Sequence, residues 1–95
     1  MQISKEQIKS VEEKIRRSAN FQRIFSGKGG QEVLDEIDKF TLYKGNTFNA
    51  DPYIHAYNAG QRSMAVFIHN IIDQDIELAR KMLKKENENV KTTKL

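Results

Sequence analysis

The chain has 95 residues, no cysteine and a formal net charge of +3 at neutral pH. This length suffices for one small domain, and a hydrophobic content of 38% allows only a modest core, which self-association or a partner would help to stabilise. The absence of cysteine excludes disulfides, thiolate metal sites and cysteine nucleophiles, and it favours a reducing compartment such as the cytosol. No stretch has the roughly 20 apolar residues that a membrane span needs, so we expect no membrane association and no cleaved signal.

The first helix is expected to begin after Ser4, whose hydroxyl can cap the first turn while Gln7 reaches back, as in a capping box. Residues 18–20 are a place where this helix could bend. The segment Ser26–Gly30 holds three glycines in four residues and is predicted to be a loop that ends the helix. The apolar face of this helix comprises Ile8, Val11, Ile15, Phe21, Ile24 and Phe25.

A second helix is predicted from about Gln31 to Thr41, with an acidic first turn that suits the helix dipole. Residues 42–50 contain a Gly-Asn turn signal and two aromatic residues that can pack against the helices. One apolar stripe of the second helix holds Val33, Leu34, Ile37 and Phe40.

The strongest local signal is the start of the third helix. Asp51 can cap the first turn, and Pro52 has the backbone angle of a first helical residue. The apolar period that follows predicts a helix to about Glu88, either continuous or broken near residues 69–73. Its members are Ile54, Tyr57, Gln61, Met64, Ala65, Ile68, Ile72, Ile76, Ala79 and Leu83.

These elements predict an all-α fold, a small three- to four-helix domain with one long C-terminal helix. The domain is expected to span residues 1–89, followed by a flexible basic tail at residues 90–95. Tyr53, Tyr57, Phe67 and Ile71 give the long helix a second apolar side, which either the first two helices or another subunit should cover. These four residues are the candidate interface.

The candidate chemistry is sparse. The segment 27–30 could contact a phosphate, but a Walker loop needs a longer spacing and a preceding strand, so a turn is the favoured interpretation. His69 and Asp73 have a spacing that can chelate a metal, yet no further ligand follows at a suitable spacing. Ser26 and Ser63 lack a nucleophile-elbow context. We therefore expect no enzyme, no catalytic residue, no metal and no cofactor.

Gly60 interrupts the long helix at a cost of roughly 1 kcal/mol relative to alanine. One explanation is the close approach of the first or second helix, with Arg62 paired to Asp35, Glu36 or Asp38. The other is that Arg62 points at a partner protein or a DNA phosphate. Residues 80–95 are also basic, which suits a helix C-terminus as well as phosphate. The candidate partner or phosphate contacts are Arg23, Lys28, Arg62, Lys81, Lys84 and Lys85.

Three short motifs resemble a family of small tailed-bacteriophage proteins, encoded among the virion structural genes of podovirus-like phages such as those of Bordetella. The motifs are the segment Phe25–Leu34, the pair Thr47-Phe48 and the triplet Gly60-Gln61-Arg62, and the resemblance covers about residues 21–72. It implies a phage-encoded, non-enzymatic protein expressed with head and portal components. It supplies no catalytic residues.

Two functions are therefore expected. The first is a structural or virion-assembly accessory protein that uses helix contacts with portal, capsid or ejection components or with itself, in the host cytoplasm during assembly or in the virion. The alternative is a small nucleic-acid-binding protein that uses its basic C-terminal tail. A third class is a regulator that blocks a host enzyme with the same helix face.

Overall fold

A computed structural model describes residues 4–92 of the chain, which form four helices and, within that range, no strand. They are α1 (Lys5–Phe25), α2 (Gly27–Phe40), α3 (Pro52–Ile72) and α4 (Ile76–Thr92). The all-α prediction is confirmed. The predicted long C-terminal helix is instead α3 and α4, separated at residues 73–75, close to the break that the sequence allowed for.

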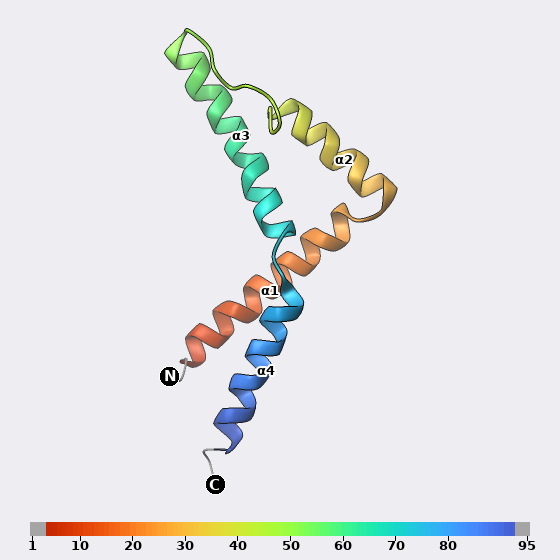
Figure 1. Cartoon of the computed structure of the whole chain (residues 1–95), viewed down its shortest axis with the longest axis vertical. Coiled ribbons are helices and arrows are strands. Elements are labelled where there is room, and N and C mark those ends of the chain that lie inside the picture. Colours follow the sequence, from red (N-terminus) through yellow and green to blue (C-terminus); the bar gives the residue numbers. More distant parts are fainter. Residues whose placement is uncertain (1–3, 93–95) are drawn as a thin grey trace.

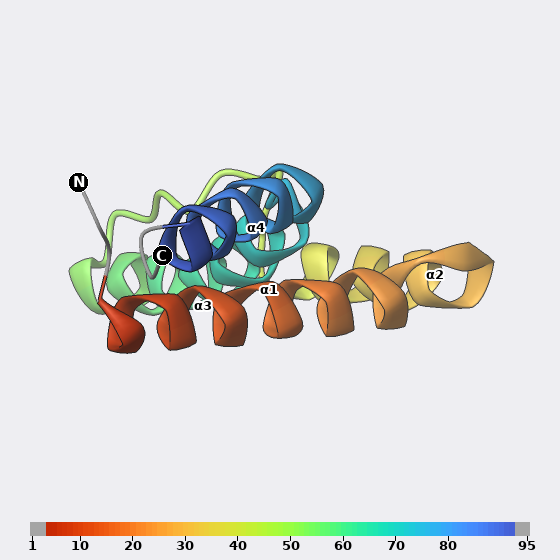
Figure 2. The same ribbon diagram turned by 90° about the horizontal axis from the view of Figure 1, so that it is seen from below.

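Helix α1 crosses the other three helices and connects them. It contacts α2, α3 and α4. Helix α2 also contacts α3, whereas the described residues of α4 pack only on α1. Figure 1 shows α2 and α3 drawing together away from α1 and diverging toward it, with α4 extending away below, and Figure 2 shows α4 lying over α1. The α1 helix is continuous through residues 18–20, where the sequence allowed for a bend, and Ser18 is buried there.

The glycine segment after α1 is not the loop that the sequence predicted. Helix α2 begins at Gly27, so only Ser26 separates the two helices. Gly27 has a φ of +77°, which turns the chain sharply, and a side chain at Gly30 would collide with the backbone of Ile24 and Phe25. Gly27 and Gly30 thus make a tight corner instead of a loop, the first through its positive φ and the second because it has no side chain to obstruct the approach.

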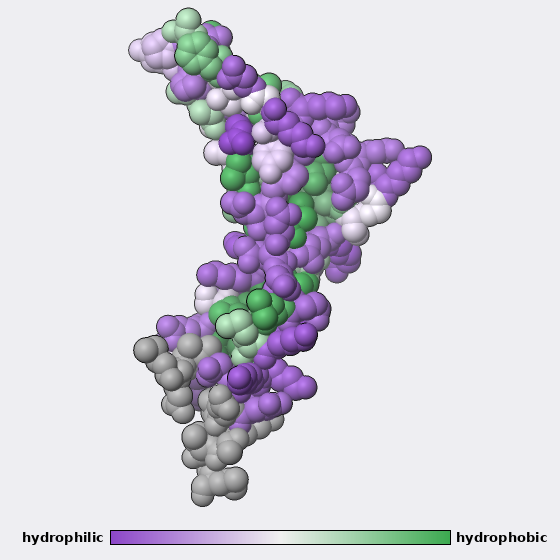
Figure 3. Space-filling model, in the orientation of Figure 1, coloured by the Kyte–Doolittle hydropathy of each residue, from purple (hydrophilic) through white to green (hydrophobic). Residues whose placement is uncertain are grey.

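The molecule is thin and open. Its Cα radius of gyration is 18.7 Å and its extents are 65 × 33 × 15 Å, whereas a compact domain of this length would have a radius of gyration of about 12 Å. Within the described residues, only Leu34, Ala65 and Ile71 are buried apolar residues. Figure 3 accordingly shows apolar side chains at the surface over the tip of α3, between α2 and α3, and over the α1–α4 pair.

Polar contacts from α1 hold the α3–α4 junction. The side-chain amide of Gln22 donates to the carbonyls of Ile72 (2.9 Å), the last residue of α3, and of Gln74 (3.0 Å), within the break between the helices. The Asp75 carboxylate accepts from the amide of Leu78 at 3.0 Å and so caps the start of α4. The predicted tail, residues 90–95, begins within α4, which runs to Thr92, and residues 93–95 lie outside the described part.

Candidate interaction surface on helix α3

The end of α2 sets the position of α3. The amide of Tyr43 donates to the carbonyl of Asp38 at 3.0 Å and that of Leu42 to Lys39 at 3.4 Å, a Schellman arrangement. Leu42 occupies the left-handed position with a φ of 60°, where glycine is usual. The buried Thr41 hydroxyl donates to the Ile37 carbonyl at 2.7 Å. This turn directs Tyr43 back toward α3.

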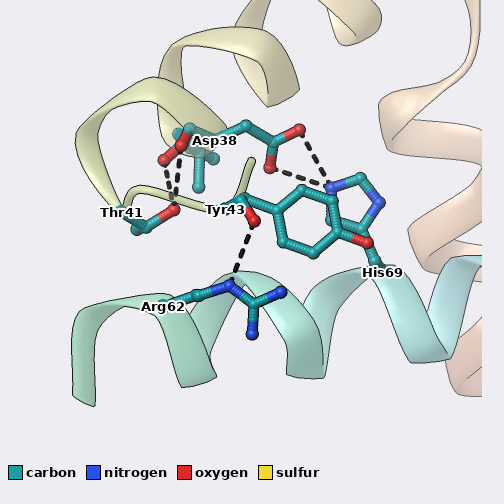
Figure 4. A network of polar contacts seen from close by, with 6 residues as sticks. Asp38, Thr41, Tyr43, Arg62 and His69 are labelled. Atoms are coloured by element: carbon teal, nitrogen blue, oxygen red, sulfur yellow. Dashed lines mark hydrogen bonds and ion pairs between the residues drawn. The ribbon is translucent and has the colours of Figure 1, made fainter. Parts of the chain in front are cut away.

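Asp38 and Tyr43 together hold His69 of α3 (Figure 4). The imidazole Nε2 lies 2.8 Å from Asp38 Oδ1 and 2.9 Å from Oδ2, so Nε2 carries the donated hydrogen. The Tyr43 ring stacks on the imidazole with centroids 4.0 Å apart and planes inclined by 3°. Sequence reasoning missed this contact because Asp38 and His69 are far apart in the chain and neither lies in a recognisable motif.

Arg62 does not pair with the acidic residues of α2 as one interpretation predicted. Its Nε donates to the Tyr43 carbonyl at 3.1 Å, and its guanidinium carbon lies 5.7 Å from the centre of the Tyr43 ring. Figure 4 shows Arg62 beneath Tyr43, whereas the Asp38 carboxylate is bound by His69. Arg62 therefore helps to fasten the turn after α2 onto α3.

The cap predicted at the start of α3 is confirmed. The Asp51 carboxylate accepts from the amide of Tyr53 at 2.9 Å, and Pro52 is the first helical residue. The preceding loop folds back along α3, where the side-chain amide of Asn58 donates to the Thr47 carbonyl at 3.3 Å. The first half of α3 is therefore held on one side by this loop and by Arg62.

The opposite side of α3 is apolar and open. Tyr53, Tyr57, Met64 and Phe67 are 86%, 66%, 56% and 50% exposed. With Gly60 they recur at spacings of four and three residues, which places them on one side of the helix. We call these five residues the α3 strip. Ile71, which the sequence placed at the same interface, is instead 4% exposed and belongs to the core.

Within the described part of the chain, nothing packs closely against Gly60. A Cβ atom added at this residue would meet nothing within 4 Å. The expected approach of α1 or α2 to Gly60 is therefore wrong. The glycine lies within the α3 strip, whereas the buried side of the helix centres on Ala65, which is fully buried.

The candidate phosphate contacts occupy three separate places. Arg23 and Lys28 flank the corner between α1 and α2, and Arg62 adjoins Tyr43 in α3. The exposed Lys81, Lys84 and Lys85 belong to α4, on the side opposite to that of Ile76, Ala79 and Leu83, which are partly buried. Of these six residues, only the three lysines of α4 share one side of a helix.

Residues 4–92 offer little other chemistry. His69 is engaged by Asp38 and not by Asp73, and no group of three or more potential ligands suited to a metal occurs among these residues. None of the described helices has the length and apolar character required to cross a bilayer.

The model of a family described as Bbp19-like phage protein matches residues 21–84. No curated protein and no solved structure matches the chain. The matched range contains all of α2 and α3, the end of α1 and the first half of α4, and so includes the corner, the loop and the α3 strip. Because the match spans more than half of the sequence, the chain belongs to this phage protein family.

Proposed function

We propose that this Bbp19-like phage protein is a non-enzymatic structural or virion-assembly accessory protein that works through contacts of its helices. The contacts would be with portal, capsid or ejection components or with another copy, in the host cytoplasm during assembly or in the virion. The proposal assigns the chain no catalytic residue, no cofactor and no membrane contact.

The observation that carries the proposal is the α3 strip. Three aromatic residues and a methionine, each at least half exposed, lie side by side on a helix whose other side is fixed by polar contacts. Exposed apolar surfaces of this kind are typical of protein-binding sites, where aromatic residues and methionine are enriched. The open shape and small core support the same conclusion, since a partner would bury surface that the chain leaves uncovered.

The experiment is genetic. The gene is deleted from a phage that encodes the protein and supplied in trans, as wild type or as Tyr57→Glu. Particle number is counted by electron microscopy, and infectivity is measured by plaque assay. We expect deletion to lower the yield of infectious particles, wild type to restore it and Tyr57→Glu to fail. Unchanged particle yield after deletion would contradict the proposal.

The second candidate function is nucleic-acid binding through α4. The specific observation is that Lys81, Lys84 and Lys85 are exposed on one side of this helix, where they can reach successive phosphates. Light scattering with duplex DNA at low and high salt tests it, with a Lys81→Glu/Lys84→Glu/Lys85→Glu triple variant. Binding that falls steeply with salt and is lost in the variant would favour this function, while packing through the α3 strip should resist salt.

A further inference from the structure

The residues of the α3 strip are spaced symmetrically along the helix, which an exposed surface does not need to be. Tyr57, Gly60, Met64 and Phe67 follow at intervals of three, four and three residues, which read the same in both directions along the helix. An antiparallel copy of this helix therefore presents the same intervals to the first. A strip of this form can pair with itself in register.

The presence of a glycine at residue 60, inside a helix, has no explanation within the single chain. A glycine inside a helix is less favourable than alanine, and nothing within 4 Å of the position of a Cβ atom offsets that cost. A bare backbone in an exposed apolar strip allows another helix to come close. The explanation for Gly60 therefore lies outside the single chain.

We propose that a second copy of this chain docks on the α3 strip, with the two α3 helices antiparallel and crossing between Gly60 and Met64. In this arrangement Met64 fills the space over the partner's Gly60, and Tyr57 faces the partner's Phe67. The long, flexible methionine thus meets the position without a side chain, and the aromatic residues meet each other. This rests on the proposed function and names the partner of the same surface.

Charge favours a second copy over an acidic or a nucleic-acid partner. The only Lys, Arg, Asp or Glu residue in α3 is Arg62, and its side chain is fastened to Tyr43 on the other side of the helix. The α3 strip itself carries no charge, so it offers a phosphate or a carboxylate no cation. Two copies of a chain with a formal charge of +3 repel each other least where their facing surfaces are neutral.

The available area is sufficient for a dimer. Aromatic side chains bury about 150–250 Å² each when covered. The exposed fractions of Tyr53, Tyr57, Met64 and Phe67 thus amount to roughly 500 Å² in each copy, or roughly 1,000 Å² in the pair. This reaches the lower limit of specific interfaces, about 1,000 Å² in total. We therefore expect the two copies to form a dimer of moderate affinity.

The first test is the mass of the full chain by light scattering over a range of concentrations, at low and high salt. We expect a dimer that survives high salt. Gly60→Leu places bulk at the crossing, and its Cβ atom would meet nothing within 4 Å in its own chain, whereas Met64→Glu places a charge there. Both should raise the dissociation constant at least roughly tenfold, with the helical circular dichroism unchanged. The matched control is Ala59→Leu, an exposed neighbour outside the α3 strip, which should remain a dimer.

The second test is orientation. Because the chain has no cysteine, single variants Ser63→Cys and Ala56→Cys can each carry one spin label per copy. In the antiparallel pair, the Ala56→Cys labels should be farther apart along the helix axis than the Ser63→Cys labels by about 15 Å, at 1.5 Å of rise per residue. With the two axes about 8–10 Å apart, the measured label distances should differ by roughly 10 Å. Equal separations would mean parallel helices and would overturn the proposed pairing.

Two outcomes separate this proposal from the one before it. A chain that is monomeric at every concentration, while Tyr57→Glu still abolishes particle assembly, overturns the self-docking and leaves the proposed function standing. A dimer that Gly60→Leu dissociates, in a phage whose particle yield does not depend on the gene, supports the self-docking and removes the proposed function. A dimer that neither Gly60→Leu nor Met64→Glu weakens also overturns the self-docking.

Discussion

His69 Nε2 lies 2.8 Å from Asp38 Oδ1, and this contact joins the last turn of α3 to the last turn of α2. Both side chains are largely buried, with 18% and 13% of their surface exposed. Such a contact should contribute more than an exposed ion pair, because water competes less for either group. It holds one side of α3 in place and leaves the α3 strip on the other.

Replacing either residue of this pair should destabilise the fold. We expect His69→Ala and Asp38→Ala each to lower the free energy of unfolding by about 1–3 kcal/mol, since each leaves a partly buried polar group without its partner. The double variant should lose less than the sum of the two. Urea denaturation followed by circular dichroism measures all three.

The matched control for that pair is Glu36 and Lys39 of α2, a 3.7 Å ion pair whose side chains are 78% and 76% exposed. Their alanine variants should change the free energy of unfolding by less than about 0.5 kcal/mol. Equal effects of the two pairs would mean that the His69–Asp38 contact does not hold α2 on α3.

Gln22→Ala should weaken the junction between α3 and α4. The variant removes both hydrogen bonds to the carbonyls of Ile72 and Gln74, and we expect a loss of about 1–2 kcal/mol. Hydrogen exchange should show faster exchange of the amides in the first turn of α4, while the start of α3 stays protected. Arg16→Ala, at an exposed position of the same helix, serves as the control. Uniform loss of protection would contradict a local role.

The glycines at the start of α2 should respond in opposite ways. Gly30→Ala introduces a Cβ atom that lies 2.7 Å from the carbonyl carbon of Phe25, so the corner must shift, at a cost of about 1–3 kcal/mol. Gly29→Ala meets nothing within 4 Å and should stabilise the helix by up to about 1 kcal/mol. Thermal unfolding of the two variants compares them directly. The same sign for both would show that the corner is not as tight as described.

Enlarging the buried side of α3 should be destabilising. Ala65 is fully buried, so Ala65→Leu must displace its neighbours and should lower the free energy of unfolding by about 1–3 kcal/mol. Ala59→Leu adds the same atoms at an exposed position and should be nearly neutral. Chemical denaturation at a concentration where both are in the same oligomeric state checks this difference. Tolerance of Ala65→Leu would contradict the close packing around Ala65.

Part of the fold follows from the sequence because local contacts decide it. The capping box of Ser4 and Gln7 and the cap at Asp51 use atoms that are three residues apart or fewer. Helical periodicity also identified the apolar side of α3. The phage family could be identified from short motifs that now prove to lie at the α1–α2 corner, in the loop before α3 and in the middle of α3.

The glycine corner shows where local reasoning fails. Three glycines in a row of four residues predict a flexible turn when each is considered alone. In the structure, Gly27 supplies a positive φ and Gly30 allows the backbone of Ile24 and Phe25 to come close, so α2 starts directly after the corner. Whether a glycine frees the chain or lets two segments touch depends on what lies beside it. Sequence alone does not show that.

From the sequence alone, the all-α class, the starts of the first and third helices and the phage family could be predicted, since hydrogen bonds and side-chain periods within a few residues are sufficient for these. The tertiary structure decided which partners the long side chains take: His69 binds Asp38, Arg62 binds Tyr43, and Gly60 remains uncovered. These pairings join residues that are distant along the chain, and their geometry is fixed only when α1 brings the helices together.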